Sequence, residues 1–192
     1  MKPRPRRGTA EETRARLVAA AAEVFNRDGY GGTDSNRLAR AAGYAPGVFY
    51  KHFDDKKQLF LAVYVEWVAA ELAALGQALE EGRPPAALAR RIVALIVDHH
   101  RRWHGFRASL RALVATDAEV RRFHRKERKK QLAAIARLQR GGGRRFSAAH
   151  DALLMFTIER TADAIGDGEA DALGVDSDAL ITLLEALVRE RL

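Results

Sequence analysis

The stretch YAPGVFYKHFDDKKQLF, residues 44–60, decides how the N-terminal part of this chain is interpreted. Pro46 suits the first position of a helix, where its missing N–H is not needed. Phe49 and Phe53 lie four residues apart and can face a core together, while Val48, Tyr50, Lys51 and His52 fall elsewhere on the surface of the same helix. The stretch therefore predicts a helix over 46–53 that is short, aromatic on its inner side and exposed on its outer side.

Two further helices are expected before this stretch. Thr9 and Glu12 have the spacing of a capping box, and the apolar residues that follow repeat with helical periodicity to Arg27. The glycine-rich segment 28–32 ends that helix, and a second, short helix is expected over 34–42. The helix over 34–42, a glycine-containing turn and the helix over 46–53 form the helix-turn-helix arrangement. In this arrangement the second helix of the pair, here the one over 46–53, enters the DNA major groove.

Composition and charge agree with a nucleic-acid-binding protein. The chain has 192 residues, a formal net charge of +8 and no cysteine, which excludes disulfides, thiolate zinc sites and cysteine nucleophiles. Residues 1–57 hold 12 Lys/Arg and 7 Asp/Glu, so the positive charge is concentrated at one end. The longest apolar run, 59–75, is interrupted by Glu66 and Glu71 and is interpreted as an amphipathic helix rather than a membrane span. A cytoplasmic location is expected.

Residues 9–60 resemble the DNA-binding domain of the tetracycline-repressor (TetR) family. The matching motifs, with their spacing intact, are Phe25…Gly29-Tyr30, Thr33, Leu38-Ala39…Ala42-Gly43, Gly47-Val48-Phe49-Tyr50-Lys51-His52-Phe53 and Lys56…Leu59. The resemblance implies an all-α homodimer with an N-terminal three-helix helix-turn-helix domain and a C-terminal helical domain for effector binding and dimerisation. It also implies a DNA-binding transcriptional regulator, most often a repressor that a small molecule releases from a palindromic operator.

The resemblance carries DNA-contacting roles onto particular residues of this chain. Phosphate contacts are implied for Thr33, Tyr50, His52 and Lys56, and base-facing positions for Pro46, Gly47, Val48 and Lys51. One departure is Ala45, where the family usually has a Ser or Thr that caps the recognition helix. Because the base-facing set has few hydrogen-bonding groups, specificity is expected to depend also on Arg4, Arg6 and Arg7 in a narrow minor groove.

The rest of the chain predicts longer helices over 86–103, 105–115, 117–140, 147–165 and from about 177 to the C-terminus, after a long helix that begins at Asp54 or Asp55. The predicted domains are 1–55 for DNA binding and 56–192 for effector binding and dimerisation. The basic run 121–130 is expected to be a solvated helix face around Phe123 and Glu127, with contact to flanking DNA as the alternative.

No enzymatic motif is found, and neither an enzyme nor a cofactor is expected. His99, His100 and His104 lack a carboxylate at ligand spacing, so a metal site is not expected. Apolar stripes on two helices instead suggest an effector pocket for a mainly hydrophobic molecule of a few hundred daltons. Its expected lining is His99, Trp103, Phe106, Met155, Phe156 and Glu159.

The last two long helices have apolar stripes wider than one bundle layer needs, and they are expected to pair across a two-fold axis. The residues assigned to that interface are Leu153, Leu154, Phe156, Ile158, Ile165, Leu180, Ile181, Leu183, Leu184, Leu187 and Val188. The alternative function is a DNA-binding protein without an effector, such as a structural nucleoid or division factor. An effector pocket argues against that alternative.

Overall fold

The computed structural model describes residues 9–141 and 146–192, and within these residues every regular element is a helix. The elements are α1 (Ala10–Asp28), α2 (Ser35–Ala41), α3 (Pro46–Phe49), α4 (Lys56–Glu80), α5 (Pro85–Arg102), α6 (His104–Thr116), α7 (Ala118–Gly141), α8 (Ala148–Gly166), α9 (Glu169–Ala172) and α10 (Ser177–Arg189). The predicted all-α class is confirmed.

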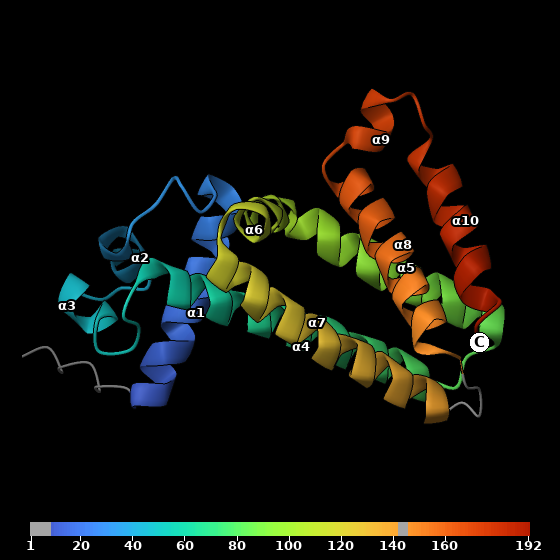
Figure 1. The fold of residues 1–192 in the computed structure, drawn as a ribbon, viewed down its shortest axis with the longest axis horizontal. Coiled ribbons are helices and arrows are strands. Elements are labelled where there is room, and N and C mark those ends of the chain that lie inside the picture. The colour runs from blue at the N-terminus through green and yellow to red at the C-terminus, as the bar shows by residue number, and fades with distance from the viewer. Residues whose placement is uncertain (1–8, 142–145) are drawn as a thin grey trace, which may run out of the picture.

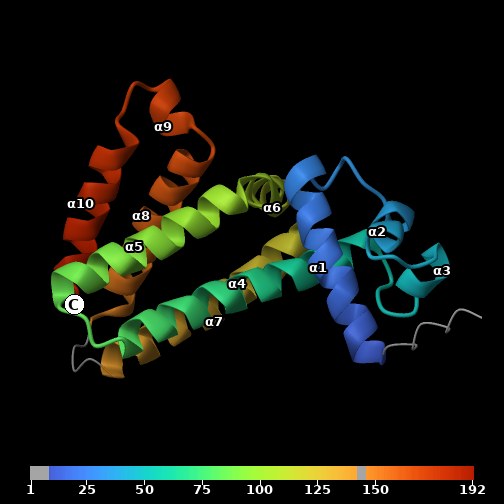
Figure 2. The same cartoon turned by 180° about the vertical axis from the view of Figure 1, so that it is seen from behind.

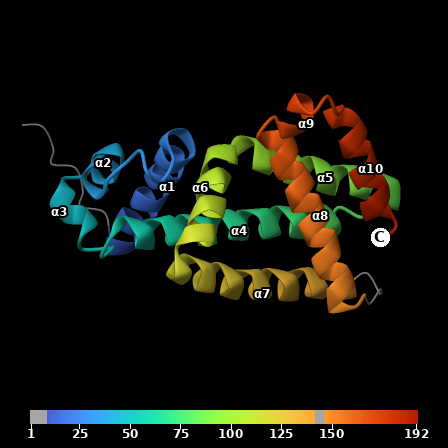
Figure 3. The same ribbon diagram turned by 45° about the horizontal axis from the view of Figure 1, so that its top comes forward.

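The first three helices lie together at one end of the elongated molecule, and α4 runs from them along most of its length (Figure 1). Seen from behind, α1 crosses the first part of α4, while α2 and α3 lie at the end farthest from the C-terminus (Figure 2). Helix α7 runs alongside α4, and α8 crosses the α4, α5 and α7 layer (Figure 3). Helix α10 packs mainly on α5.

Two apolar clusters hold this arrangement together. The first joins α1, α2 and α3 to the first half of α4 and to α6, with Phe25, Phe60 and Phe106 fully buried at its centre. The ring centres of Phe25 and Phe60 lie 5.1 Å apart, and those of Phe60 and Phe106 lie 4.7 Å apart. Aromatic pairs attract each other at such distances. The second cluster joins α5, α8 and α10. The first cluster contains residues on both sides of the predicted domain boundary between residues 55 and 56. The boundary itself stays a prediction.

The capping expectations can be compared with the backbone. Both hydrogen bonds of the Thr9–Glu12 capping box are present. Asp55 caps α4 through the Gln58 N–H at 2.8 Å, so α4 begins at Lys56 rather than at Asp54 or Asp55. Helix α3 ends at Phe49 rather than Phe53, since residues 50–52 form turns in which the His52 and Phe53 N–H groups both donate to the Phe49 carbonyl. The short helix α9 was not predicted.

Among the described residues, α4 alone is long and apolar enough, by length and composition, to cross a membrane. Its buried residues Phe60, Tyr64 and Trp67 lie in the first cluster, and α4 packs against α1, α5 and α7. In this fold α4 is therefore the central core helix, which explains its apolar composition.

Candidate DNA-binding face and effector pocket

The helix-turn-helix domain presents α3 and the turn after it outward. Tyr50 is 57% exposed, and its ring packs edge-on against the buried Phe49 at 5.2 Å. Lys51 is exposed, and Val48, Pro46 and His52 are half-buried. The Ala45 side chain cannot accept a hydrogen bond, so α3 has no side-chain cap, and Pro46 occupies its first turn. The structure therefore brings five of the residues implied as DNA contacts together on one short segment.

Gly47 is also on this segment, and nothing inside the chain requires a glycine there. A Cβ added at residue 47 meets no atom within 4 Å, and its φ is not positive. The backbone at residue 47 is therefore open to a close approach by an external partner, which glycine permits. This observation agrees with the base-facing position implied for Gly47.

Two of the implied phosphate contacts are placed differently from the expectation. The Lys56 ammonium donates to the carbonyls of Tyr30 (2.7 Å) and Thr33 (2.8 Å) and lies 4.1 Å from the centre of the Tyr30 ring. Burial lowers the pKa of Lys56, an effect that Asp34 partly opposes. In this conformation Lys56 fastens the segment that precedes α2. Thr33 is buried, and its hydroxyl has no hydrogen-bond partner among the described residues.

The predicted arginine arm falls outside the described residues, because Arg4, Arg6 and Arg7 all lie in the segment 1–8. The other basic features are placed clearly. Arg37 pairs with Asp28 at 2.7 Å and also donates to the Gly32 carbonyl at 2.7 Å, which fixes the turn between α1 and α2. These contacts help to position α2, against which α3 packs.

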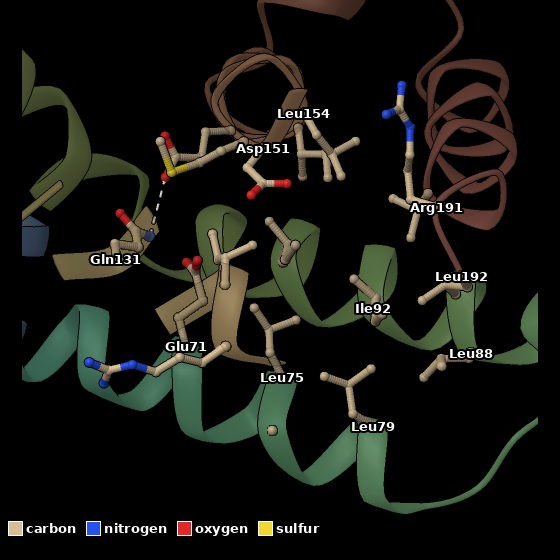
Figure 4. A pocket seen from close by; sticks show the side chains of 18 of the residues that line it. Glu71, Leu75, Leu79, Leu88, Ile92, Gln131, Asp151, Leu154, Arg191 and Leu192 are labelled. Carbon is tan, nitrogen blue, oxygen red and sulfur yellow. Dashed lines mark hydrogen bonds between the residues drawn. The ribbon is translucent and has the colours of Figure 1, made fainter. Parts of the chain in front are cut away.

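A cavity of about 610 Å³ lies between α4, α5, α7, α8 and α10 (Figure 4). Much of its wall is aliphatic, from Leu75, Leu79, Leu88, Ile92, Ile96, Ile135, Leu154 and Ile158. Its polar lining includes the buried side chains of Glu71, Gln131, Asp151 and Glu159. Arg83, Arg137 and Arg191 also border it. The cavity is thus mainly apolar with a few polar groups, as binding sites for small molecules usually are.

The structure brings only Met155 and Glu159 of the expected pocket residues to this cavity. Phe106 is fully buried against Phe60 in the first cluster, because α6 packs on α1 and α4. Phe156 is 56% exposed on the outer face of α8. Trp103 ends α5 and packs against the first cluster. These three placements correct the expected lining.

His99 likewise lies outside the large cavity. It stacks on Trp67 at 4.5 Å and borders a separate hollow of about 230 Å³ that shares Glu71. Burial lowers the pKa of His99. Among the described residues no group of three or more His, Cys, Asp or Glu side chains could hold a metal ion, and His104 is exposed whereas His100 is buried.

Sequence reasoning missed several cavity residues, above all Glu71, Gln131 and Asp151. One signal was available for Glu71, which interrupts the most apolar helix of the chain but is only 7% exposed.

Arg128 belongs to the basic run 121–130, which was predicted to be a solvated helix face. It pairs with Glu159 and lies 5.6 Å from the centre of the Phe156 ring. The basic run 121–130 is therefore not wholly solvated, since Glu127 is buried and Phe123 packs against the first cluster.

Next to the cavity, a buried network of charges joins α4, α5, α6 and α8. Asp163 accepts hydrogen bonds from His100 Nδ1 at 2.8 Å and from Arg107 at 3.1 and 2.9 Å, and Arg111 lies 2.8 Å away. Although burial opposes it, these cations hold the pKa of Asp163 well below its usual range. Burial lowers the pKa of His100, but Asp163 and Glu71 outweigh that effect and raise it.

Helix α6 carries this network to the DNA-binding domain. The Asn26 side chain of α1 donates to the Arg102 carbonyl at 2.7 Å and accepts from the Phe106 N–H at 3.1 Å, and Ser109 accepts from the Tyr30 N–H at 3.0 Å. A Cβ at Gly105 would lie 2.0 Å from the Asn26 carbonyl oxygen, so this close approach of α6 to α1 requires glycine. The cavity and the helix-turn-helix are thus connected through packed helices.

Fold and site together define a helix-turn-helix protein with a second helical part that encloses a ligand-sized cavity. Residues 17–63 match the family model "Bacterial regulatory proteins, tetR family". The resemblance of the N-terminal part of the chain to the TetR family, seen in the sequence, is therefore confirmed.

Similarity to curated proteins is concentrated near the N-terminus. The chain is 38% identical over 69 residues to the "HTH-type transcriptional activator FasR" of Mycolicibacterium smegmatis, which covers 36% of this chain and 32% of that protein. It is 26% identical over 84 residues to the "Fatty acid metabolism regulator protein" of Bacillus subtilis, which covers 44% and 41%. The alignments thus span 32% and 41% of these relatives' lengths.

Solved structures match nearly the whole fold. A transcriptional regulator from Rhodococcus sp. Rha1 superposes with a TM-score of 0.69 at 24% identity, over 91% of this chain and 93% of that one. The regulator FadR from Bacillus subtilis, solved in complex with stearoyl-CoA, superposes with a TM-score of 0.67 at 17% identity, over 93% and 98%. At such identities the comparisons show a common fold.

Proposed function

We propose that this protein is a transcriptional regulator that binds a near-palindromic operator as a homodimer and leaves it when a mainly hydrophobic effector fills the cavity. The observation that carries the proposal is the cavity of about 610 Å³, which packed helices connect to a TetR-family helix-turn-helix. Repression and a cytoplasmic location belong to the same proposal.

Several features support DNA binding by α3 and the turn after it. Tyr50 and Lys51 are exposed, and the unneeded glycine at 47 leaves the backbone open to a close neighbour. A lysine can donate to guanine O6 and N7, and Val48 can contact a thymine methyl. Arg4, Arg6 and Arg7 remain the proposed minor-groove contacts.

The homodimer is proposed through the outer faces of α8 and α10. Leu153, Phe156 and Leu183 are 62%, 56% and 67% exposed, and the two helices lie beside each other. Exposed large apolar side chains on adjacent helices favour burial against a second copy, and a two-fold axis makes such a contact close on itself. Ile158, Ile165, Leu184 and Val188 belong to the chain's own second cluster and are therefore removed from the proposed interface.

The effector proposal rests on the cavity. Its volume lies within the range of roughly 300–1,000 Å³ that is usual for small-molecule sites. A ligand can change DNA affinity only if it binds one conformer of the protein better than the other. Glu71 on α4 and the Asp163 network that reaches α6 are the groups through which such a preference could be transmitted to α1 and α3.

The test begins with selection of genomic fragments by the full-length protein, followed by fluorescence anisotropy on the selected duplex. Contacts with six to ten phosphates predict that affinity falls by roughly 10³ to 10⁵ between 50 and 200 mM salt. A thermal-shift screen of hydrophobic, polar and metal ligands then identifies effectors, which are tested for release of the duplex. Salt-independent binding or failure to select any sequence contradicts the DNA part. Stabilisation by metals or highly polar compounds alone contradicts the effector part, and operator binding that no ligand alters favours a DNA-binding protein without an effector.

A further inference from the structure

Glu71 is an unusual residue for the wall of an apolar cavity. It lies on α4, is 7% exposed, and its Oε2 has no hydrogen-bond partner in the described part of the chain. Figure 4 shows its side chain pointing from α4 into the space between α4 and α8. A buried carboxylate oxygen without a donor is costly, so a native protein that retains one usually has a use for it.

No neighbouring group in the described part of the chain donates a hydrogen bond to this oxygen. The nearest charged partner is His100, whose Nε2 lies 3.7 Å from Glu71 Oε2, too far for a hydrogen bond, and whose Nδ1 is already held by Asp163. Gln131 is directed to Glu159, with its Nε2 3.5 Å from Glu159 Oε1. His100 Nε2 has no hydrogen-bond partner either, so it and Glu71 Oε2 face each other as an ion pair. The other oxygen of Glu71 has no hydrogen bond among the described residues, and it is the oxygen that a molecule in the cavity can reach.

We infer that Glu71 selects the effector by accepting a hydrogen bond from it, so that the effector carries a donor group, a hydroxyl or a protonated amine, on an apolar body. This inference rests on the proposed function, because it concerns the ligand of the same cavity. The aliphatic wall formed by Leu75, Ile92 and Leu154 takes the apolar body.

The charges around Glu71 disfavour an anionic head group at this point. Asp151 and Glu159, both buried, border the same cavity, and of these two only Glu159 has a cationic partner among the described ion pairs. A carboxylate or phosphate placed beside Glu71 would meet like charge in a poorly solvated site. An amine or hydroxyl meets acceptors instead.

The arginines that border the cavity provide a contrasting location for an anion. Arg83 is 48% exposed and pairs with Glu81, and Arg191 lies 5.1 Å from the centre of the Phe146 ring. Arg137 also borders the cavity and is exposed. Solvent screens the charges of Arg83 and Arg137, and Arg83 is also paired with Glu81, so these arginines attract an anion less strongly than a buried cation does. An acyl-CoA, with its phosphates near these arginines and its chain inside, is the competing occupant that the experiment must include.

The experiment compares four ten-carbon probes on the full-length protein by isothermal titration: decylamine, 1-decanol, decanoate and decanoyl-CoA. The amine and the alcohol are expected to bind more tightly than decanoate. Glu71→Gln is expected to weaken decylamine binding by about tenfold, the value of a hydrogen bond to a charged group, and to change decanol binding less. Glu66→Gln, an exposed glutamate on the same helix that does not border the cavity, is the matched control.

The outcomes separate this inference from the proposed function. Tightest binding by decanoate or decanoyl-CoA overturns the inference. Equal binding of all four probes, or an order of affinities that Glu71→Gln leaves unchanged, overturns it as well. In both cases the cavity still binds apolar molecules and the proposed function stands. If none of the probes binds and no hydrophobic compound stabilises the protein, both fail. If Glu71→Gln does not fold, the order of the four probes on the wild-type protein decides.

Discussion

Replacing Asp163 by Asn tests the charge network that connects the two parts of the molecule. Asp163 is 6% exposed and binds His100, Arg107 and Arg111, and the Arg107 side chain is itself 8% exposed. The substitution keeps the size of the side chain but leaves Arg107 buried without its carboxylate. Breaking a buried ion pair in this way costs about 3–5 kcal/mol of unfolding free energy. For a chain of this length that lowers Tm by roughly 6–20 °C.

Asp167→Asn is the control for this measurement. Asp167 is 28% exposed and pairs with Arg111, which is 40% exposed, so its loss should cost less than about 1 kcal/mol. Both variants would be compared with the wild-type protein by calorimetry and by circular dichroism at one pH. The reasoning is refuted if Asp163→Asn melts within about 2 °C of the wild type, or if Asp167→Asn is the more damaging change.

Three further predictions concern the DNA face, the dimer and pH. Gly47→Ala should leave Tm unchanged or raise it, since alanine favours a helix by up to ~1 kcal/mol, yet weaken operator binding; retained affinity in anisotropy would show that no close approach occurs there. Leu183→Glu should give a folded monomer by light scattering, whereas Leu184→Glu should unfold the chain because Leu184 is 4% exposed in the second cluster; a dimeric Leu183→Glu protein contradicts the proposed interface. The pKa of His100 is raised, so its stabilising contribution is complete below about pH 6.5 and is lost as pH rises through the higher folded value. The difference in urea stability between the wild type and His100→Asn should therefore shrink from pH 6 to pH 9, and growth with pH would contradict this assignment.

The sequence by itself determined the local structure of the N-terminal domain. The Thr9–Glu12 capping box and the glycine-rich turn are local signals, and they identified α1 and its end correctly. The Pro46–Phe53 segment was identified as the second helix of the pair for the same reason, although its last turn is not α-helical. The motif spacing revealed the resemblance to the TetR family because it depends only on positions along the chain, and residues 17–63 match the family model.

The cavity could be found only in the tertiary structure. Helical periodicity tells which residues of α5 and α8 share a face, but it does not tell which neighbouring helix covers that face. Met155 and Glu159 reach the cavity, whereas Phe156, the next residue in the chain after Met155, points outward and Phe106 fills the first cluster.

The apolar stripes of α8 and α10 raised the same ambiguity, because a helix can bury one stripe in its own chain and offer another to a partner. Leu184 and Leu183 illustrate it: they are adjacent in sequence, yet helical geometry places Leu184 in the second cluster and leaves Leu183 67% exposed. Only the packing of α10 on α5 decides which of the two is core.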